Sequence, residues 1–291
     1  MFGRTIYNMI YIILSICCSV FVSVLLKLAK RYEIDTRQAI MWNYSIAALL
    51  TYLIYDPAWP TFNNSLFPVY ISLGVLLPSL FVILALSVRY TGIVKTDVAQ
   101  RLSLFIPVLA AFLLFGEAHS TLKIAGIFFA FLAIICSVPW QKKGSSSSSS
   151  YWIYPVTVFV GMGIIDILFK QIAKTEAIAF TSSLIVVFIL AFIISALFLL
   201  YLFFIKKLKF TLINVLCGWI LGIANFGNIL FYLKAHQALA NQPSLVFSAM
   251  NIGVIVLGSL VGVLIFHEKL SRLNYFGIVL ALISIVLMSQ A

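Results

Sequence analysis

Long apolar runs alternate with short polar segments along the whole chain. Ten of these runs predict helices that cross a membrane, because a membrane span needs about 20 consecutive apolar residues. The predicted spans are Met9–Leu28, Ala39–Tyr55, Phe67–Val88, Ile93–Phe115, Leu122–Val138, Ile153–Ile172, Ala177–Phe204, Leu212–Leu233, Leu245–Phe266 and Tyr275–Met288. The connections between them are short, which predicts antiparallel neighbours in an all-α membrane bundle.

A polar low-complexity segment divides the chain near its midpoint. Gly144 is followed by six serines, a composition typical of a flexible linker. We therefore predict a first five-helix repeat over residues 1–143, a linker over residues 144–150 and a second five-helix repeat over residues 151–291.

The two halves share a sequence motif. FGEAHSTLKIAGIFFA begins at Phe115 and FHEKLSRLNYFGIVLA begins at Phe266, and seven of the sixteen positions are identical. The motif pairs Glu117 with Glu268, Ser120 with Ser271, and Gly126 with Gly277. An odd number of spans per half would place the second half upside down relative to the first. Inverted repeats of this kind are typical of secondary transporters.

The motif residues have two interpretations. Ser120 and Ser271 precede apolar runs and are expected to act as helix N-caps. The two motif glutamates either cap helices and anchor loops or take part in gating. Separately, Gly218 and Gly222 have a small-xxx-small spacing that lets helices approach closely in lipid.

Composition supports the membrane assignment. The chain is 63% hydrophobic and 9% charged, whereas soluble domains are about 45–50% apolar and about 25% charged. A soluble protein is therefore excluded. The net charge of +11 arises from basic residues at the ends of spans, so it does not indicate nucleic-acid binding. Cysteine and histidine show no metal-ligand spacing, and we expect neither a metal nor a cofactor.

In its repeat motif the chain resembles the drug/metabolite transporter superfamily, and within it the ten-helix EamA-type transporters. The resemblance rests on the GE or HE pair followed by serine and then glycine, and on Pro107 and Gly258, each ten residues before a motif glutamate. It implies an inverted-repeat bundle that carries small metabolites. It also implies a central cavity among the third, fourth, eighth and ninth helices, with the first and sixth alongside.

Basic residues are distributed unequally between the two ends of the bundle. The connections after helices 1, 3, 5, 7 and 9 contain 13 lysines and arginines, and the opposite end contains four or five. The positive-inside rule therefore predicts that both termini lie outside the cytoplasm. This prediction differs from the common arrangement in the resembled family, whose members keep both termini in the cytoplasm.

Three polar stripes lie within predicted spans, where an ionisable side chain costs about 2.5–3.5 kcal/mol near the membrane centre. The first stripe is Asp97, Gln100 and Arg101 on the fourth span, with i, i+3, i+4 spacing. It is either a structural ion pair or a cavity wall. As a cavity wall, Arg101 would bind a carboxylate or phosphate, and Asp97 would bind an ammonium group or carry a coupling proton.

The other stripes lie on the sixth and eighth spans. Asp166 is either a site of proton uptake or the partner of Lys170, whose side chain is expected to reach the membrane interface. Asn225 and Asn228 either bond to a neighbouring helix or to substrate. Asn251 on the ninth span is the repeat partner of Gln100 and is expected on the opposite cavity wall. Asn43 and Lys27 are weaker candidates.

Together these observations predict a secondary active transporter in the cytoplasmic membrane. It would move a small polar metabolite by alternating access, with an amino acid or a related zwitterion or anion as the expected substrate and export as the expected direction. The chain has no nucleotide-binding loop and no clustered catalytic groups, so neither ATP-driven transport nor an enzyme is expected. The alternative is a flippase for a lipid-linked or amphipathic solute. The protein is expected to be a monomer or a homodimer.

Overall fold

The computed structural model describes residues 2–32, 34–59, 65–137, 149–175, 179–206, 210–267 and 271–290. These residues form an all-helical bundle without a strand in the described ranges. Its helices are α1 (Phe2–Arg31), α2 (Thr36–Tyr55), α3 (Phe67–Thr91), α4 (Ile93–Leu102), α5 (Phe105–Leu113), α6 (Thr121–Ser137), α7 (Ile153–Lys174), α8 (Phe180–Lys206), α9 (Leu212–Ala238), α10 (Pro243–Phe266) and α11 (Arg272–Ser289), with a short 3₁₀ helix η1 (Ser149–Trp152) before α7.

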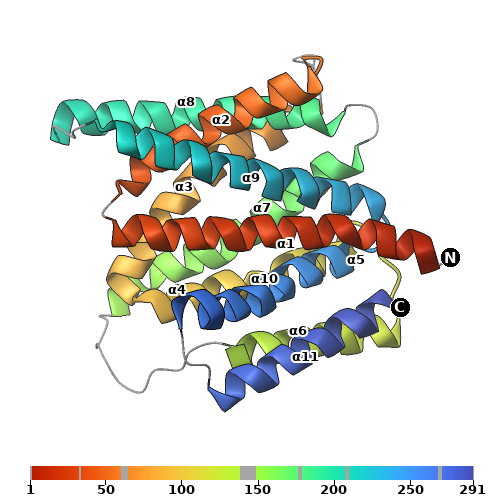
Figure 1. The fold of residues 1–291 in the computed structure, drawn as a ribbon. Coiled ribbons are helices and arrows are strands. Elements are labelled where there is room, and N and C mark those ends of the chain that lie inside the picture. The colour runs from red at the N-terminus through yellow and green to blue at the C-terminus, as the bar shows by residue number, and fades with distance from the viewer. Residues whose placement is uncertain are drawn as a thin grey trace.

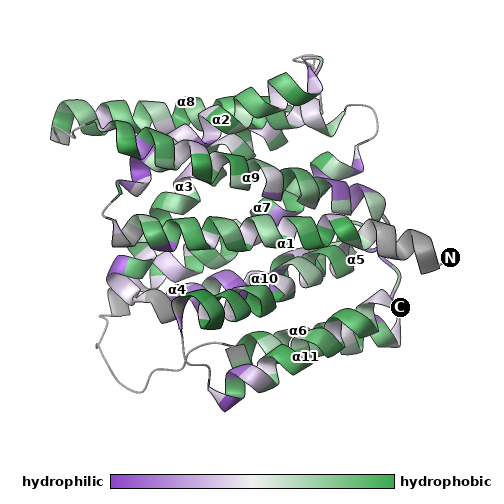
Figure 2. Ribbon diagram, in the orientation of Figure 1, coloured by the Kyte–Doolittle hydropathy of each residue, from purple (hydrophilic) through white to green (hydrophobic). Residues whose placement is uncertain are grey.

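The long helices are apolar over most of their length, and polar residues gather towards their ends (Figure 2). Eight described segments are long and apolar enough to cross a membrane, with α4 and α5 counted as one, and α6 is a shorter apolar helix. Large apolar side chains such as Leu53, Leu113 and Phe204 are more than 60% exposed. Exposure of so much apolar surface is typical of a multi-pass membrane protein.

Both termini lie at the same end of the bundle (Figure 1). We call this the terminal end. The opposite end holds the connections α1–α2, α3–α4, α6–α7, α8–α9 and α10–α11. The helix ends beside these connections carry Lys27, Lys30, Arg31, Arg37, Arg89, Lys95, Lys206 and Arg272, and we call this the basic end.

The helices pack in pairs that join the two halves of the chain. α6 packs along α11, α1 and α2 pack on α9, and α7 and α8 pack on α3. The α2–α9 contact confirms the expected role of the glycine pair. A Cβ atom at Gly218 would lie 2.8 Å from the Ala39 carbonyl oxygen, and one at Gly222 would lie 2.5 Å from that of Asn43.

The predicted fourth span is not one continuous helix. It is broken at Ser103 and Leu104 into α4 and α5. Pro107 has no N–H to donate to the Ser103 carbonyl, which instead accepts from Ile106 across 3.0 Å. A proline commonly interrupts a helix in the turn before it. The sequence prediction treated Ile93–Phe115 as one span and overlooked the effect of this proline on the helix.

The repeat motif caps helices as expected. The Ser120 hydroxyl accepts from the Lys123 N–H at 3.1 Å and begins α6, and the Ser271 hydroxyl accepts from the Asn274 N–H at 3.2 Å and begins α11. Gly126 and Gly277 are both buried, and the Ser284 hydroxyl donates to the Gly126 carbonyl across the α6–α11 contact.

Two parts of the sequence predictions fall on residues that the structure does not describe. Glu268 lies outside the described residues, and so does the linker as far as residue 148. Ser149 and Ser150, which were expected to belong to the flexible linker, instead form the first half of η1.

Candidate functional site

A polar cavity of about 350 Å³ lies between α1, α3, α4, α7, α9 and α10. Its polar lining residues are Ser19, Ser23, Asp97, Gln100, Arg101, Ser103, Asp166, Asn225, Asn228, Tyr232 and Asn251. Every residue that the sequence predicted for substrate binding or proton coupling is among them. They come from helices of both halves of the chain, so the cavity exists only when the halves are packed together.

The α4 wall of the cavity carries a charged pair. Arg101 Nε lies 2.8 Å from Asp97 Oδ2, and both side chains are about 30% exposed. The ion pair expected from the i, i+4 spacing is therefore confirmed, and it lines the cavity rather than a helix contact. Only one guanidinium nitrogen is used in this contact, so the other Arg101 donors can meet a solute.

The facing wall carries a hydrogen bond between α7 and α9. The Tyr232 hydroxyl donates to Asp166 Oδ1 at 2.9 Å. The predicted alternative, an ion pair between Asp166 and Lys170, is wrong. Lys170 is also not directed to the membrane interface, because it is 1% exposed and donates to the carbonyl oxygens of His236 and Ala240.

The three asparagines lie on the remaining walls. Asn228 accepts a hydrogen bond from the Ser15 hydroxyl at its side-chain oxygen, 2.9 Å away, which joins α9 to α1. Asn251 donates to the Phe247 carbonyl of its own helix at 3.1 Å. Asn225 is 8% exposed at the cavity surface. Asn228 thus both bonds to a neighbouring helix and lines the cavity, although the sequence analysis treated a bond to a helix and a bond to substrate as alternatives.

The cavity lining is exposed at Ser23 of α1 and Gln100 of α4, and it is buried at Leu80, Phe169 and Tyr232. Gln100 is exposed, Asp166 is half-buried and Tyr232 is 7% exposed. One turn further along α9, His236 is completely buried. Access is therefore wider from the side of α4, and packed residues close the terminal end.

A second buried polar group strengthens this closure. Glu117, in the connection between α5 and α6, accepts from the Ser244 N–H at 2.8 Å and from its hydroxyl at 2.7 Å. Lys123 Nζ lies 3.1 Å from the same carboxylate, and both charged side chains are almost fully buried. Glu117 therefore caps the N-terminus of α10 and ties the first half of the chain to the second.

Sequence reasoning overlooked the α1 wall of the cavity. Ser19 and Ser23 line it, and isolated serines in an apolar helix carry little signal on their own. A faint signal existed, since Lys27 and Lys170 are 143 residues apart and the same offset pairs Ser23 with Asp166. The weaker candidates Asn43 and Lys27 do not line the cavity, and Asn43 is buried in the α2–α9 contact.

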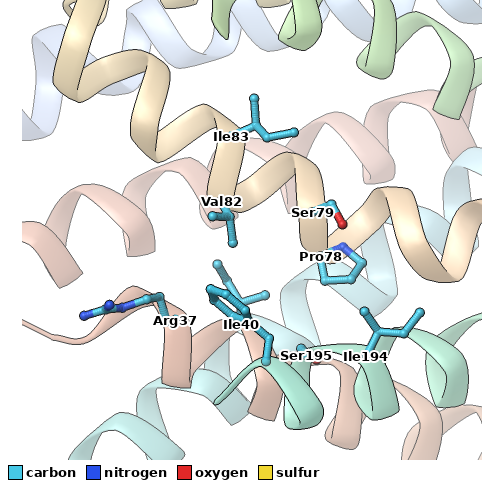
Figure 3. A pocket seen from close by; sticks show the side chains of 9 residues that line it. Arg37, Ile40, Pro78, Ser79, Val82, Ile83, Ile194 and Ser195 are labelled. Atoms are coloured by element: carbon cyan, nitrogen blue, oxygen red, sulfur yellow. The ribbon is translucent and has the colours of Figure 1, made fainter. Parts of the chain in front are cut away.

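A separate pocket of about 270 Å³ lies between α2, α3 and α8 and contains none of the predicted site residues. Pro78 and Ser79 of α3 face Ile194 and Ser195 of α8 across it, with Arg37 and Ile40 at one side (Figure 3). Its lining is mostly apolar, which makes it unsuited to a small polar solute.

Comparison with known proteins defines the relatives of the chain. No protein-family model matches it. An uncharacterized protein of Haemophilus influenzae is 43% identical over 289 residues, which cover 96% of each chain. This chain belongs to the same family. Members of the family thus share a sequence that extends over the whole bundle rather than over one half.

The fold of this family also occurs in a solved crystal structure. That protein matches with a TM-score of 0.75 over 97% of this chain and 96% of its own, at 12% sequence identity. At this identity the likeness concerns the fold alone. The helical arrangement of the family is therefore one that an experimentally determined protein adopts.

Proposed function

We propose that the protein is a secondary transporter that carries a small polar solute across the membrane by alternating access. The observation that carries the proposal is the cavity, which gathers polar residues from five helices, α1, α4, α7, α9 and α10, in the interior of an otherwise apolar bundle. Ionisable residues in apolar spans are costly and mark solute or ion pathways. The resemblance to drug/metabolite transporters supports the same function.

The helix packing supports an inverted-repeat mechanism. In the predicted repeat, α7 corresponds to α1, α8 to α2 and α9 to α3. The contact of α1 with α9 therefore corresponds to that of α7 with α3, and the contact of α2 with α9 to that of α8 with α3. The α6–α11 contact is converted into itself. Alternating access would then arise when the halves rock against each other around the cavity between them.

The charges of the cavity favour a zwitterionic or anionic solute. Arg101 offers a planar guanidinium that suits a carboxylate, and Asp97 offers an acceptor for an ammonium group. Asparagine amides add donors and acceptors that fix orientation. An amino acid carries both charges on one small scaffold and is the proposed substrate class.

The test uses purified protein in liposomes. Uptake of each radiolabelled L-amino acid is measured with and without an imposed pH gradient. At least one is expected to move faster than in protein-free liposomes. The Arg101→Leu variant is expected to lower that rate about tenfold or more, since a hydrogen bond to a charged group contributes about 1.5–3 kcal/mol.

The matched control is Arg89→Leu, at the exposed end of α3 outside the cavity, which is expected to retain parental transport. An equal loss of transport in both variants would contradict the assignment of Arg101 to the solute-binding site. If no amino acid moves but a labelled phospholipid changes leaflet, the flippase would replace the solute transporter.

A further inference from the structure

A polar cluster lies beyond the cavity at the closed, terminal end of α7 and α9. It consists of Lys170, which is 1% exposed, and His236, which is completely buried. Neither side chain belongs to the cavity lining. Buried polar groups are normally satisfied by partners, so two such residues at the end of a solute cavity require an explanation.

The cluster is joined to the cavity by a regular arrangement of α7 and α9. Tyr232 bonds to Asp166, and the Lys170 ammonium bonds to the His236 carbonyl at 3.3 Å. Each helix advances four residues, or one turn, between these two contacts. The cluster is therefore the next layer along the direction that leads from the cavity to the terminal end.

Lys170 retains an unused donor. Its ammonium donates to the carbonyls of His236 and Ala240, at 3.3 and 3.1 Å. An ammonium group has three N–H donors, so one remains. Within the described part of the chain no carboxylate lies within 4 Å of it, and Glu117 is occupied by Ser244 and Lys123. Glu117 acts on Lys170 electrostatically from beyond 4 Å, but it is shared with Lys123. A buried cation with no carboxylate within 4 Å among the described residues favours binding of an anion.

His236 adds further unused hydrogen-bonding groups. Neither ring nitrogen has a hydrogen-bond partner among the described residues. The ring is packed edge-on against Tyr232 and Phe247, with centroids 4.7 Å away in both cases. A neutral imidazole offers one donor and one acceptor. The cluster thus combines an ammonium group that has no carboxylate within 4 Å among the described residues with unused hydrogen-bonding groups.

We propose that Lys170 and His236 form a second binding site, which takes the anionic group of the solute when the bundle opens towards the terminal end. The inference rests on the proposed transport function and extends it. Arg101 binds the anionic group when the cavity is open on the side of α4, and the Lys170–His236 cluster binds it on the opposite side. The solute class is consequently one that carries a carboxylate or a similar small anion.

The test measures whether the cluster prefers an anion, without knowledge of the natural solute. The four native cysteines are replaced by alanine, and His236→Cys is placed in nanodiscs, where both ends are accessible. The probes are an anionic sulfonatoethyl methanethiosulfonate and its cationic trimethylammonium analogue. Rates are normalised to those with free 2-mercaptoethanol. The anionic probe is expected to react about tenfold faster than the cationic one, because the Lys170 charge is poorly screened when buried.

Lys170→Gln in the same background is expected to abolish this preference. Phe247→Cys provides a second position that leaves both cluster residues intact and covers the case in which His236→Cys does not fold. Ser23→Cys on the α1 wall is the control and is expected to react at rates that Lys170→Gln leaves unchanged.

Two results would overturn the inference. One is equal reactivity of both probes at His236→Cys and Phe247→Cys. The other is no reaction at either position while Ser23→Cys reacts. Neither result depends on amino-acid uptake by the parent protein. That uptake measurement tests the proposed transport function separately. If the anionic probe reacts faster but the protein transports no solute, the anion-binding site would be supported and the proposed transport function would be contradicted.

Discussion

The Tyr232 hydroxyl donates a hydrogen bond to Asp166 across 2.9 Å, joining α7 to α9 at the wall of the cavity. This bond satisfies a carboxylate that has no cation within 4 Å among the described residues. Asp97 differs, because Arg101 neutralises it. The two cavity carboxylates therefore have different environments and are expected to have different roles.

We predict that Asp166 carries a coupling proton. Transport by Asp166→Asn is expected to lose its dependence on pH, because an amide cannot take up the coupling proton. Asp97→Asn is the comparison, and it is expected to weaken solute binding while retaining the pH dependence. Uptake in liposomes over a series of buffers measures both. Full pH dependence in both variants would remove proton coupling from these carboxylates.

We predict that Glu117 stabilises the contact between the two halves. Glu117→Gln leaves Lys123 buried without its counter-ion, which costs about 3–5 kcal/mol for a buried pair. Thermal unfolding in detergent is expected to show a large loss of stability. Removing both charges, in Glu117→Gln with Lys123→Met, is expected to recover part of it. A double variant less stable than Glu117→Gln alone would contradict this account.

The α2–α9 contact allows a matched pair of glycine variants. A Cβ atom at Gly222 would lie 2.5 Å from the Asn43 carbonyl oxygen, whereas one at Gly258 meets nothing within 4 Å. Gly222→Ala is therefore expected to destabilise the protein by about 1–3 kcal/mol through overpacking. Gly258→Ala is expected to be neutral or stabilising, since alanine is the better helix residue. Equal melting temperatures for the two variants would disprove the close contact.

The charge distribution predicts the orientation of the bundle. The thirteen lysines and arginines that the sequence assigns to the connections after predicted helices 1, 3, 5, 7 and 9 predict that the basic end is cytoplasmic and that both termini are outside. Green fluorescent protein fused after Ala291 is expected to remain dark, and alkaline phosphatase at the same site to be active. The opposite pattern would assign the terminal end to the cytoplasm.

Much of the site could be predicted because polar residues in an apolar helix stand out and their spacing assigns them to one face. Asp97, Gln100 and Arg101 share a turn of α4 and line the cavity together. The position of Lys170 could not be predicted in this way. Its acceptors, at His236 and Ala240, are 66 and 70 residues away in sequence, and only the packing of α7 on α9 brings them together.

The cavity serines and the helix break required the structure for different reasons. Ser19 and Ser23 contribute only because α1 packs between α9 and α10, an arrangement that no local pattern encodes. The interruption before Pro107 was missed because the apolar residues of Ile93–Phe115 were taken together as one span, although only the part that forms α5 is strongly apolar. Hydropathy measures the preference of a segment for lipid. It does not detect the loss of one backbone N–H donor at a proline.

The break between α4 and α5 gives α4 an independence that the other long helices lack. α4 is ten residues long, is joined to α3 through Gly92 at φ 89°, and ends where the backbone ladder is interrupted. α4 packs on α7 and α5 packs on both α7 and α10. We expect the two breaks to let α4 tilt separately from α5. Because α4 carries the Asp97–Arg101 pair, a small tilt of α4 would change both the width of the cavity entrance and the position of the charges that first contact the solute.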